Sequence, residues 1–253
     1  MACLMNASRA NIPAAECLIV ALDFDNARDA LGLVDKLDGA VHFFKVGYEL
    51  FIGEGHEVIA ALHERGHRTF LDIKMNDVNE TVRRAVRNLA RRDTGIDFMT
   101  IYGEAVTARS AKEGKGDSAL KILQVTLLTS LGLDDLQELG IVGEGRRFAT
   151  VEDYVVWRAQ QSLEAGCDGL ISSGQNARML REHCGDDFIL VCPGIRPKGV
   201  GTDEHKRACT PHEAIVDGAD YLVVGRPIRD AGNPADAARA IIDEIRQGLD
   251  DRG

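Results

Sequence analysis

The sequence lacks an excess of basic residues and has no long apolar run. Its 253 residues include 30 Lys and Arg against 40 Asp and Glu, which gives a formal net charge of −10. A protein of that sign does not attract the phosphates of nucleic acids, so we expect no nucleic-acid partner. The longest apolar run near the start, Cys17–Leu22, is too short for a signal peptide or a membrane span. We therefore expect a soluble cytoplasmic protein that does not bind a membrane.

Paired cysteines and nucleotide-binding motifs are also missing. The six cysteines include no C-x-x-C pair and are too sparse for a disulfide scaffold, so we interpret them as small buried side chains in a reducing compartment. No G-x-G-x-x-G follows the first apolar run, and no Walker motif occurs. These absences argue against a doubly wound nucleotide-binding sheet.

What the sequence does contain is an alternation of short apolar runs with helix-like stretches. The runs are nearly continuous in apolar residues, which is typical of parallel strands covered on both faces. They are residues 17–24, 41–47, 68–74, 97–103, 120–129, 167–174, 188–195 and 219–226. Helical spacing of apolar residues occurs at 26–38, 79–92, 151–165 and 235–249. We therefore predict an α/β protein with a single (β/α)₈ TIM barrel over residues 17–253, after a flexible leader of residues 1–16.

Two long irregular stretches, 140–150 and 196–210, interrupt the alternation. Loops of this length in a compact domain are either surface insertions or mobile lids over a site. No internal sequence repeat is evident, so the barrel is not predicted from repetition but from the order of its elements.

The residues at the carboxyl ends of the apolar runs are mostly charged. In a barrel of this kind the active site lies at those ends. The polar groups there are Asp23, Lys45, Asp72 with Lys74, Tyr102, Thr129, Ser172 with Ser173, Arg196 and Arg226. A charge beside an apolar strand is costly to desolvate unless it is paired, so these residues indicate function more than stability.

The densest cluster is Asp72, Lys74 and Asp77. Residues two apart on a strand share a face, so Asp72 and Lys74 are expected side by side. Lys45 from the neighbouring strand would complete an array of Lys, Asp, Lys and Asp, in which each charge has an opposite charge beside it. The alternative is a structural ion network with Asp77 as the N-cap of the next helix. Four charges from two strand ends exceed what capping requires, and we favour a catalytic array.

A second cluster follows the last two strands. Gly194 with Arg196, and Gly225 with Arg226, stand where phosphate sites of such barrels are usual. Glycine lets backbone N–H groups approach an anion, and a guanidinium matches the geometry of phosphate oxygens. The sequence therefore predicts a phosphate site here. The alternative is a pair of surface turns with solvated arginines.

One motif, His63-Glu64-Arg65-Gly66-His67, matches the H-E-x-x-H pattern of zinc proteases. That chemistry requires both histidines on one face of a helix, but Gly66 is placed to end the helix before His67. His67 would also stand at the N-terminal end of a strand, on the opposite side of the barrel from the site. We predict no metal site in the chain.

In this order and at this spacing, the motifs resemble the orotidine 5′-phosphate decarboxylase family, in particular its bacterial branch. The resemblance extends from Leu18 to about Ala238. The motifs that carry it are Ala21-Leu22-Asp23, Lys45-Val46-Gly47, Phe70-Leu71-Asp72-Ile73-Lys74 through Asp77, Leu128-Thr129-Ser130, Pro193-Gly194-Ile195-Arg196-Pro197 and Val224-Gly225-Arg226-Pro227-Ile228. The resemblance implies a barrel that decarboxylates orotidine 5′-phosphate to uridine 5′-phosphate, the last step of UMP synthesis, with no metal or organic cofactor.

The resemblance also implies roles for the residues around the reacting ring. Asp72 would lie against the substrate carboxylate, and Lys74 would protonate carbon 6 as carbon dioxide leaves. Asp23 would bind a ribose hydroxyl, and Lys45 would join the ribose region to the charged array. Thr129 would hydrogen-bond to the edge of the pyrimidine.

On the phosphate side, the resemblance implies that Arg226 pairs with the 5′-phosphate with help from the Gly225 amide. Arg196 and His205 would belong to the loop that covers the phosphate. His205 stands where the bacterial pattern usually has a glutamine. Because a histidine can still donate to phosphate, we expect weaker or pH-dependent closure of the loop and not a loss of activity.

A homodimer is the last implication of the resemblance. Asp77 and Thr81 would reach across the interface into the partner's site. Between them this chain reads Val78-Asn79-Glu80, where the bacterial pattern usually reads Ile-Pro-Asn. The absence of the proline should loosen the turn, but it leaves Thr81 in its place.

Two other functions stay open from the sequence. A magnesium-dependent branch of the same superfamily acts on keto-sugar phosphates and shares the Asp-x-Lys-x-x-Asp element. That branch carries a glutamate metal ligand where this chain has Lys45, and a lysine there would repel magnesium. The other alternative is a non-catalytic phosphoribosyl-binding barrel, against which the retention of Lys74 and both aspartates argues.

Overall fold

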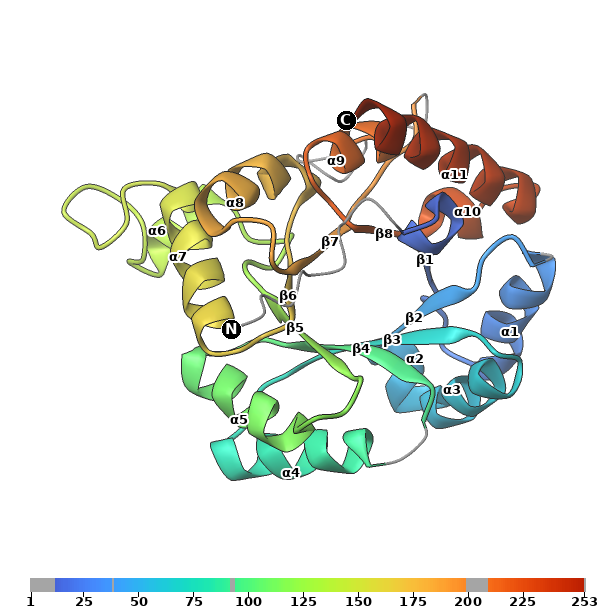
Figure 1. Ribbon diagram of the computed structural model, residues 1–253, viewed down its shortest axis with the longest axis horizontal. Coiled ribbons are helices and arrows are strands. Elements are labelled where there is room, and N and C mark those ends of the chain that lie inside the picture. Colours follow the sequence, from blue (N-terminus) through green and yellow to red (C-terminus); the bar gives the residue numbers. More distant parts are fainter. Residues whose placement is uncertain (1–11, 38, 92–93, 199–208, 253) are drawn as a thin grey trace, which may run out of the picture.

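The computed structural model describes residues 12–37, 39–91, 94–198 and 209–252. Eight parallel strands pair in sequence order and close on themselves, because β1 also pairs with β8 (Figure 1). They are β1 (Leu18–Ala21), β2 (Phe43–Gly47), β3 (Arg68–Met75), β4 (Ile96–Ile101), β5 (Lys121–Val125), β6 (Gly169–Ile171), β7 (Ile189–Pro193) and β8 (Tyr221–Val224). A strand lies at each of the eight predicted apolar runs, and the (β/α)₈ barrel is confirmed.

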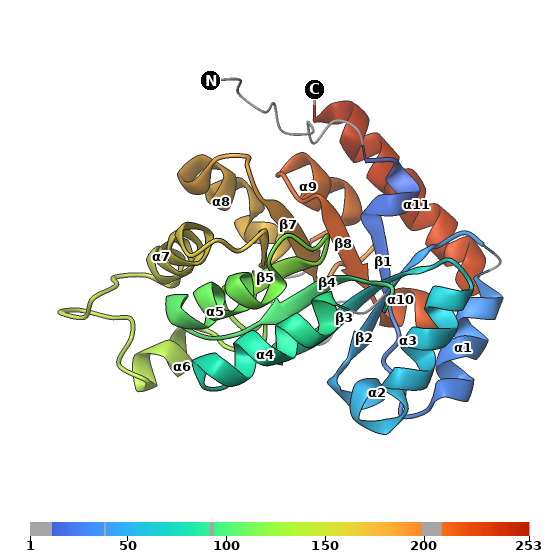
Figure 2. The ribbon, with the colours of Figure 1, turned by 60° about the horizontal axis from the view of Figure 1, so that its bottom comes forward.

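Helices surround this barrel (Figures 1 and 2). They are α1 (Ala27–Lys36), α2 (Tyr48–Gly53), α3 (Gly55–Glu64), α4 (Asn79–Ala90), α5 (Ala105–Lys115), α6 (Leu133–Glu138), α7 (Val151–Glu164), α8 (Ala177–Cys184), α9 (Pro211–Val216), α10 (Arg226–Arg229) and α11 (Pro234–Asp251), with short 3-10 turns η2 (Ala14–Cys17) and η3 (Gly174–Asn176). Among the described residues, no helix is both long enough and apolar enough to cross a bilayer.

Glycines turn the chain from a helix into the next strand at several places. Gly39, Gly66, Gly95, Gly166 and Gly218 all have a positive φ between a helix and the following strand. Only glycine adopts that conformation without strain from a Cβ atom, which is why helices commonly end there. At Gly66 the consequence is that α3 ends before His67, so His63 and His67 do not share a helical face. His67 instead stacks against His42.

The apolar side chains form an inner and an outer core, because successive residues of a strand face opposite sides. Phe43, Phe70 and Phe98 pack inside the barrel, whereas Phe44 and Leu71 pack between the strands and the helices. At the N-terminal ends of the strands, the guanidinium of Arg68 lies 4.1 Å from the centre of the Phe43 ring. The interior is therefore filled at that end, and the opposite end is left for the polar residues.

A Gly-x-Asp sequence precedes or begins three of the four even-numbered strands, β4, β6 and β8, and sequence reasoning missed this short repeat. The carboxylates of Asp97, Asp168 and Asp220 accept the backbone N–H of the preceding odd-numbered strand, from Thr69, Ile122 and Leu190 respectively. Each carboxylate also pairs with a cation, namely Arg68, Lys115 and Arg181. The repeat thus ties neighbouring strands together at the barrel end opposite the predicted site.

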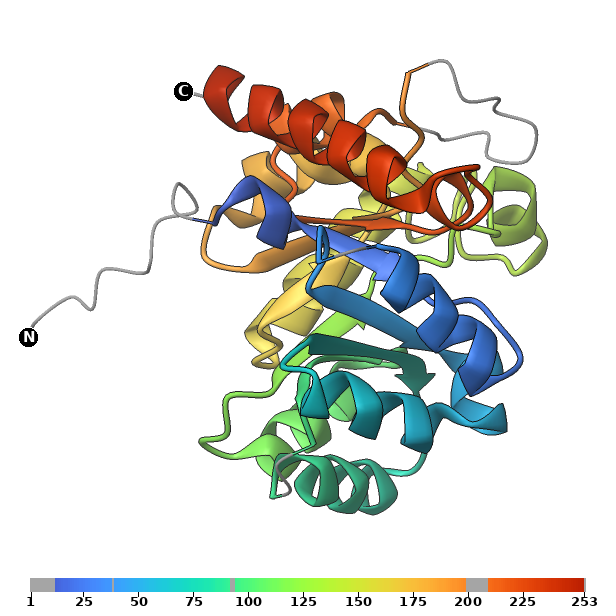
Figure 3. The same ribbon diagram turned by 90° about the vertical axis from the view of Figure 1, so that its right-hand side faces the viewer.

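Two segments that the sequence set apart from the strands have a defined place in the structure. Residues Ala14–Cys17, mostly within the expected leader, form η2 and pack against α11 (Figure 3). Residues 140–150 form the loop between α6 and α7, which extends away from the barrel at the left of Figure 1. That loop is held near its base by a bridge between Val142 and Phe148. Of the two interpretations, surface insertion or lid over a site, its position away from the barrel favours a surface insertion.

Candidate active site

Four charged side chains meet at the carboxyl ends of β1, β2 and β3. The ammonium Nζ of Lys45 lies 2.9 Å from Oδ1 of Asp23 and 3.8 Å from Oδ2 of Asp72. The Nζ of Lys74 lies 2.9 Å from Oδ1 of Asp72. The result is a row of alternating sign, Asp23, Lys45, Asp72, Lys74, which we call the charged row. Lys45 and Asp72 in its middle are only 12% and 15% exposed, so their attraction is less screened by water than at the surface.

Asp77 is not a member of this row within one chain. Its side chain is exposed, and its Oδ1 accepts the backbone N–H of Val78 at 2.6 Å. Thr81 is exposed in the first turn of α4. From the sequence, Asp77 was predicted as the fourth charge and as a residue contributed by a partner subunit. Inside the chain the fourth charge is Asp23.

Lys74 has an unusual backbone conformation. Among the described residues it is the only non-glycine residue with a positive φ, at 45°. The cause is an irregularity in the pairing of β3 with β4: Leu71 pairs with Met99 and Met75 with Ile101, so three residues of β3 face a single residue of β4. That single residue is Thr100. Its hydroxyl accepts the backbone N–H of Lys74 at 2.9 Å and donates to Oδ1 of Asp72 at 2.9 Å.

Sequence reasoning missed Thr100 because it lies inside an apolar run. The only signal was a hydroxyl side chain among apolar neighbours in the strand next to the Asp-Ile-Lys element. A strand was assumed to be regular, and a regular strand gives no reason for a threonine there to contact two charged residues at once.

A cavity of about 310 Å³ opens above the charged row. Its described lining is Lys45, Phe70, Asp72, Lys74, Val125, Leu127, Leu128, Thr129, Ser130, Ile171, Ser172, Pro193 and Val223. The charged groups all come from β2 and β3, and the lining from the later strands is uncharged, which suits a flat ligand with one charged edge. The volume lies in the range of small-molecule sites.

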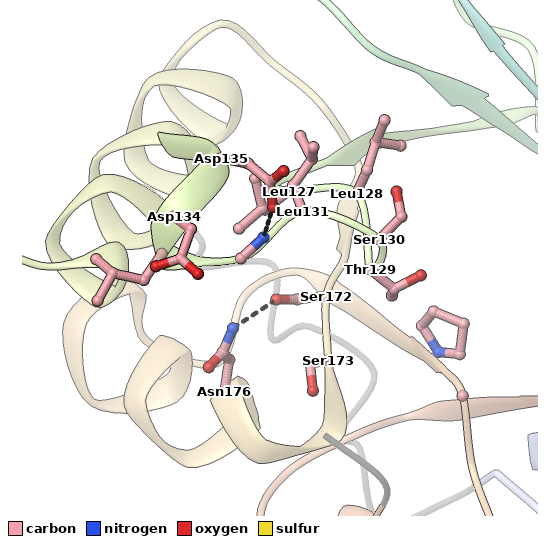
Figure 4. A pocket seen from close by; sticks show the side chains of 14 residues that line it. Leu127, Leu128, Thr129, Ser130, Leu131, Asp134, Asp135, Ser172, Ser173 and Asn176 are labelled. Carbon is pink, nitrogen blue, oxygen red and sulfur yellow. Dashed lines mark hydrogen bonds between the residues drawn. The ribbon is translucent and has the colours of Figure 1, made fainter. Parts of the chain in front are cut away.

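This cavity continues into a second one of about 480 Å³, with which it shares Thr129, Ser130 and Ser172 (Figure 4). Figure 4 shows Thr129 and Ser130 on the segment after β5, facing Ser172, Ser173 and Asn176 on the segment after β6. The buried hydroxyl of Ser172 accepts from Nδ2 of Asn176 at 3.5 Å. Hydroxyl and amide groups therefore line this part of the site, together with the carboxylates of Asp134 and Asp135.

The predicted phosphate residues lie on the other side, after β7 and β8. The turn at Gly225 lies against Asp23, since a Cβ atom at Gly225 would stand 3.4 Å from Oδ2 of Asp23. Arg226 begins α10 and is exposed. The backbone N–H of Arg196 donates to the carbonyl of Cys209 at 3.0 Å, which brings together the two ends of the segment between them. His205 lies outside the described residues.

The donor set of the row does not suit a metal ion. Of the Asp72 carboxylate, Oδ1 accepts from Lys74 and Thr100, and Oδ2 faces the ammonium of Lys45. Two ammonium groups beside the same carboxylate would repel a cation. Over the part of the chain that the structure describes, no three or more His, Cys, Asp or Glu side chains are grouped to hold a metal.

Comparison with known proteins places this arrangement in a family. Residues 16–241 match the family described as orotidine 5′-phosphate decarboxylase / HUMPS family. The chain is 45% identical over 236 residues to the orotidine 5′-phosphate decarboxylase of Nitrobacter winogradskyi, which covers 93% of this chain and 95% of that protein. It is 43% identical over 237 residues to the same enzyme of Methylococcus capsulatus, covering 93% and 94%.

A solved structure agrees with the sequence comparisons. The crystal structure of orotidine 5′-phosphate decarboxylase from Lactobacillus acidophilus matches with a TM-score of 0.77 at 37% identity, covering 91% of this chain and 99% of that chain. Sequence and fold thus agree over nearly the whole length, and the chain belongs to the orotidine 5′-phosphate decarboxylase / HUMPS family.

Proposed function

We propose that the protein decarboxylates orotidine 5′-phosphate to uridine 5′-phosphate and carbon dioxide, without a cofactor. The observation that carries the proposal is the charged row at the edge of a cavity whose remaining described lining is uncharged, with the Lys74 ammonium 2.9 Å from the Asp72 carboxylate. Such a row offers a negative group to a departing carboxylate and a positive group, with a proton, to the carbon it leaves.

The chemistry of the reaction explains why these two groups stand side by side. When the bond between carbon 6 and the carboxylate breaks, its electron pair stays on carbon 6, in the plane of the ring, where the π-system cannot delocalise it. The fixed ammonium of Lys74 stabilises that charge and then transfers a proton to carbon 6. Asp72 repels the substrate carboxylate and holds the ammonium in place. Lys45 balances Asp72 from the other side.

The remaining predicted residues are assigned to binding. Thr129, which lines both cavities, would hydrogen-bond the pyrimidine edge. Asp23 and Lys45 would hold the ribose hydroxyls. Gly225, Arg226 and Arg196 would bind the phosphate, together with His205 from outside the described residues. Contacts with the distant phosphate can be used to close the site and to orient the reacting bond.

We also propose that two copies of the chain form a dimer in which Asp77 and Thr81 complete the partner's site. Both side chains are exposed, so in one chain they have no role in the cavity. Exposed apolar residues accompany them on the segments that follow β2 and β3: Tyr48 is 51% exposed, Ile52 78% and Val78 70%. Exposed apolar groups next to a site are typical of a surface that another protein covers.

The experiment is to follow the absorbance of orotidine 5′-phosphate with purified protein in excess EDTA, with Lys74→Ala in parallel. We expect turnover by the parent protein and a loss of more than about 1,000-fold in kcat in the variant, because stabilisation of the carbanion and protonation both disappear. Turnover only of a keto-sugar phosphate, and only with magnesium, would instead assign the metal-dependent branch. Binding of uridine 5′-phosphate without any turnover would indicate a binding barrel.

A further inference from the structure

We propose that Thr100 is a positioning residue for the reaction, whose single hydroxyl group sets the places of both Lys74 and Asp72. The inference rests on the proposed decarboxylation and extends it to a residue of a different strand. Thr100 does not line the cavity and would not touch the substrate. It would act through the two residues that do.

The pairing of β3 with β4 leaves extra residues on β3. Asp72, Ile73 and Lys74 occupy the length of strand that Thr100 alone spans on β4. Two extra residues on one strand cannot all keep ladder hydrogen bonds, and they leave backbone groups without strand partners. The N–H of Lys74 is one such group, and it donates to Oγ1 of Thr100 at 2.9 Å. The side chain of Thr100 thus takes the place of a missing strand carbonyl.

The hydrogen bonds of the Thr100 hydroxyl have a defined direction. A hydroxyl has one proton to give, and Thr100 gives it to Oδ1 of Asp72 at 2.9 Å. The same oxygen accepts from Nζ of Lys74 at 2.9 Å. Backbone of Lys74, hydroxyl of Thr100, carboxylate of Asp72 and ammonium of Lys74 therefore form a closed ring. Any movement of one member shifts the ammonium that would deliver the proton.

Burial prevents water from replacing the hydroxyl. Thr100 is 0% exposed, so water has no access to substitute for it. Lys74 is held at a φ of 45°, which residues with a Cβ atom adopt only when their surroundings impose it. Without the acceptor for its N–H, the backbone of Lys74 loses a contact that stabilises this conformation. Its side chain would then point in a different direction.

The test compares Thr100→Val, which keeps the shape and removes the hydroxyl, with Thr100→Ser, which keeps the hydroxyl. Thr69→Val is a matched control, because Thr69 is also 0% exposed in the same barrel but its hydroxyl has no hydrogen-bond partner among the described residues. We expect Thr69→Val to keep parental activity and Thr100→Ser to stay within about 5-fold of it. For Thr100→Val we expect kcat to fall about 100-fold, the loss typical of a reacting group misplaced by an ångström.

The readout that separates positioning from general damage is the division between kcat and KM. The ring, ribose and phosphate contacts lie elsewhere, so KM for orotidine 5′-phosphate and Kd for uridine 5′-phosphate should change less than about 3-fold in Thr100→Val. Equal loss in Thr100→Ser and Thr100→Val, or a kcat of Thr100→Val near the parental value, would overturn the proposal. If Thr100→Val does not fold, Thr100→Ala takes its place in the comparison with Thr100→Ser.

A structural measurement keeps this proposal separate from the proposed function. If the parent protein itself fails to turn over orotidine 5′-phosphate, the decarboxylase function fails. The role of Thr100 is then decided by a crystal structure of Thr100→Val. A change in φ of Lys74 and a longer distance from its Nζ to Asp72 support the proposal, and an unchanged pair refutes it.

Discussion

Gly47, the last residue of β2, lies against the charged row. A Cβ atom there would stand 2.9 Å from Nζ of Lys45 and 3.7 Å from Oδ1 of Asp23. Its φ of −91° is one that alanine also adopts, so the reason for a glycine is the space and not the backbone. The ammonium of Lys45 is the end of a flexible side chain. An added Cβ atom would therefore displace this ammonium and leave the strand in place.

We therefore expect Gly47→Ala to lower kcat/KM for orotidine 5′-phosphate by about 10- to 100-fold while the protein stays folded. Steady-state kinetics and thermal unfolding measure the two quantities. Gly32→Ala in α1 is the control, since no atom of the described residues lies within 4 Å of a Cβ atom there. It should keep full activity and gain about 0.5–1 kcal/mol of stability. Parental activity in Gly47→Ala would show that the place of Lys45 is not critical.

At the same scale, the sequence was informative about residue types and less so about contacts. Spacing alone indicated that Asp72 and Lys74 share a face, and they do meet. That Asp23 is the outer charge of the row depends on the register of β1 with β2, in which Ala21 pairs with Lys45. Register between strands far apart in sequence cannot be read from either strand alone.

At the scale of elements, the Gly-x-Asp repeat shows how buried charges join the strands. Oδ1 and Oδ2 of Asp168 lie 2.6 and 2.7 Å from Nζ of Lys115, and Oδ2 accepts the N–H of Ile122 at 2.8 Å. Both side chains are nearly buried, with exposures of 15% and 5%. One carboxylate therefore connects the residue before β6, the second residue of β5 and the end of α5.

Asp168→Asn should lower the free energy of unfolding by about 3–5 kcal/mol, because it leaves the buried ammonium of Lys115 without its counter-charge. Urea unfolding at pH 7 measures this loss. Asp236→Asn is the control. It breaks a pair with Arg239 of which both partners are more than half exposed, and such pairs contribute no more than about 1 kcal/mol. A loss in Asp168→Asn no larger than in the control would contradict the expectation.

The defect of Asp168→Asn should also depend on pH. Burial lowers the pKa of Lys115 from its usual 10.5, and the hydrogen bond with Asp168 partly offsets that effect. Because the folded state releases this proton at a lower pH than the unfolded state does, the contribution of Lys115 to stability rises with pH between the two pKa values. Removing Asp168 lowers the folded pKa further. The loss of stability should therefore be larger at pH 7 than at pH 10.

The irregular features of the fold could not be predicted from sequence patterns. The apolar runs located every strand because burial on both faces leaves a continuous signal. The offset between β3 and β4 left no such signal, since Asp72, Ile73 and Lys74 alternate between polar and apolar as in a regular strand. The Gly-x-Asp repeat was overlooked because its three copies are short and widely separated. Their common role is visible only when the strands stand side by side.

At the scale of the whole molecule, the proposed dimer predicts that two inactive variants restore activity when they are mixed, which a monomeric enzyme would not do. If Asp77 acts in the partner's site, then Lys74→Ala inactivates the site of its own chain and Asp77→Ala inactivates the site of the partner. A mixed dimer of the two variants contains one site with neither substitution and one with both. Refolding the two inactive variants together should thus restore activity to about a quarter of the sites.

The test measures the activity of the mixture before and after joint refolding. Sedimentation shows whether the dimer has formed. Lys74→Ala mixed with Asp72→Ala is the control, because both residues would act in their own chain and no intact site can form. Recovery in neither mixture would mean that Asp77 does not cross an interface. The roles of His205 and of the loop around it stay predictions, because that residue lies outside the described part of the chain.

The left-handed backbone of Lys74 places this position under a different evolutionary constraint from its neighbours. An L-residue with a side chain is less stable in that conformation by about 1–2 kcal/mol, and glycine escapes the penalty. Selection for folding alone would therefore replace this lysine by glycine, and only continuous selection for turnover keeps it. A lineage that lost the need for the reaction should lose Lys74 early, before the barrel itself shows any sign of decay.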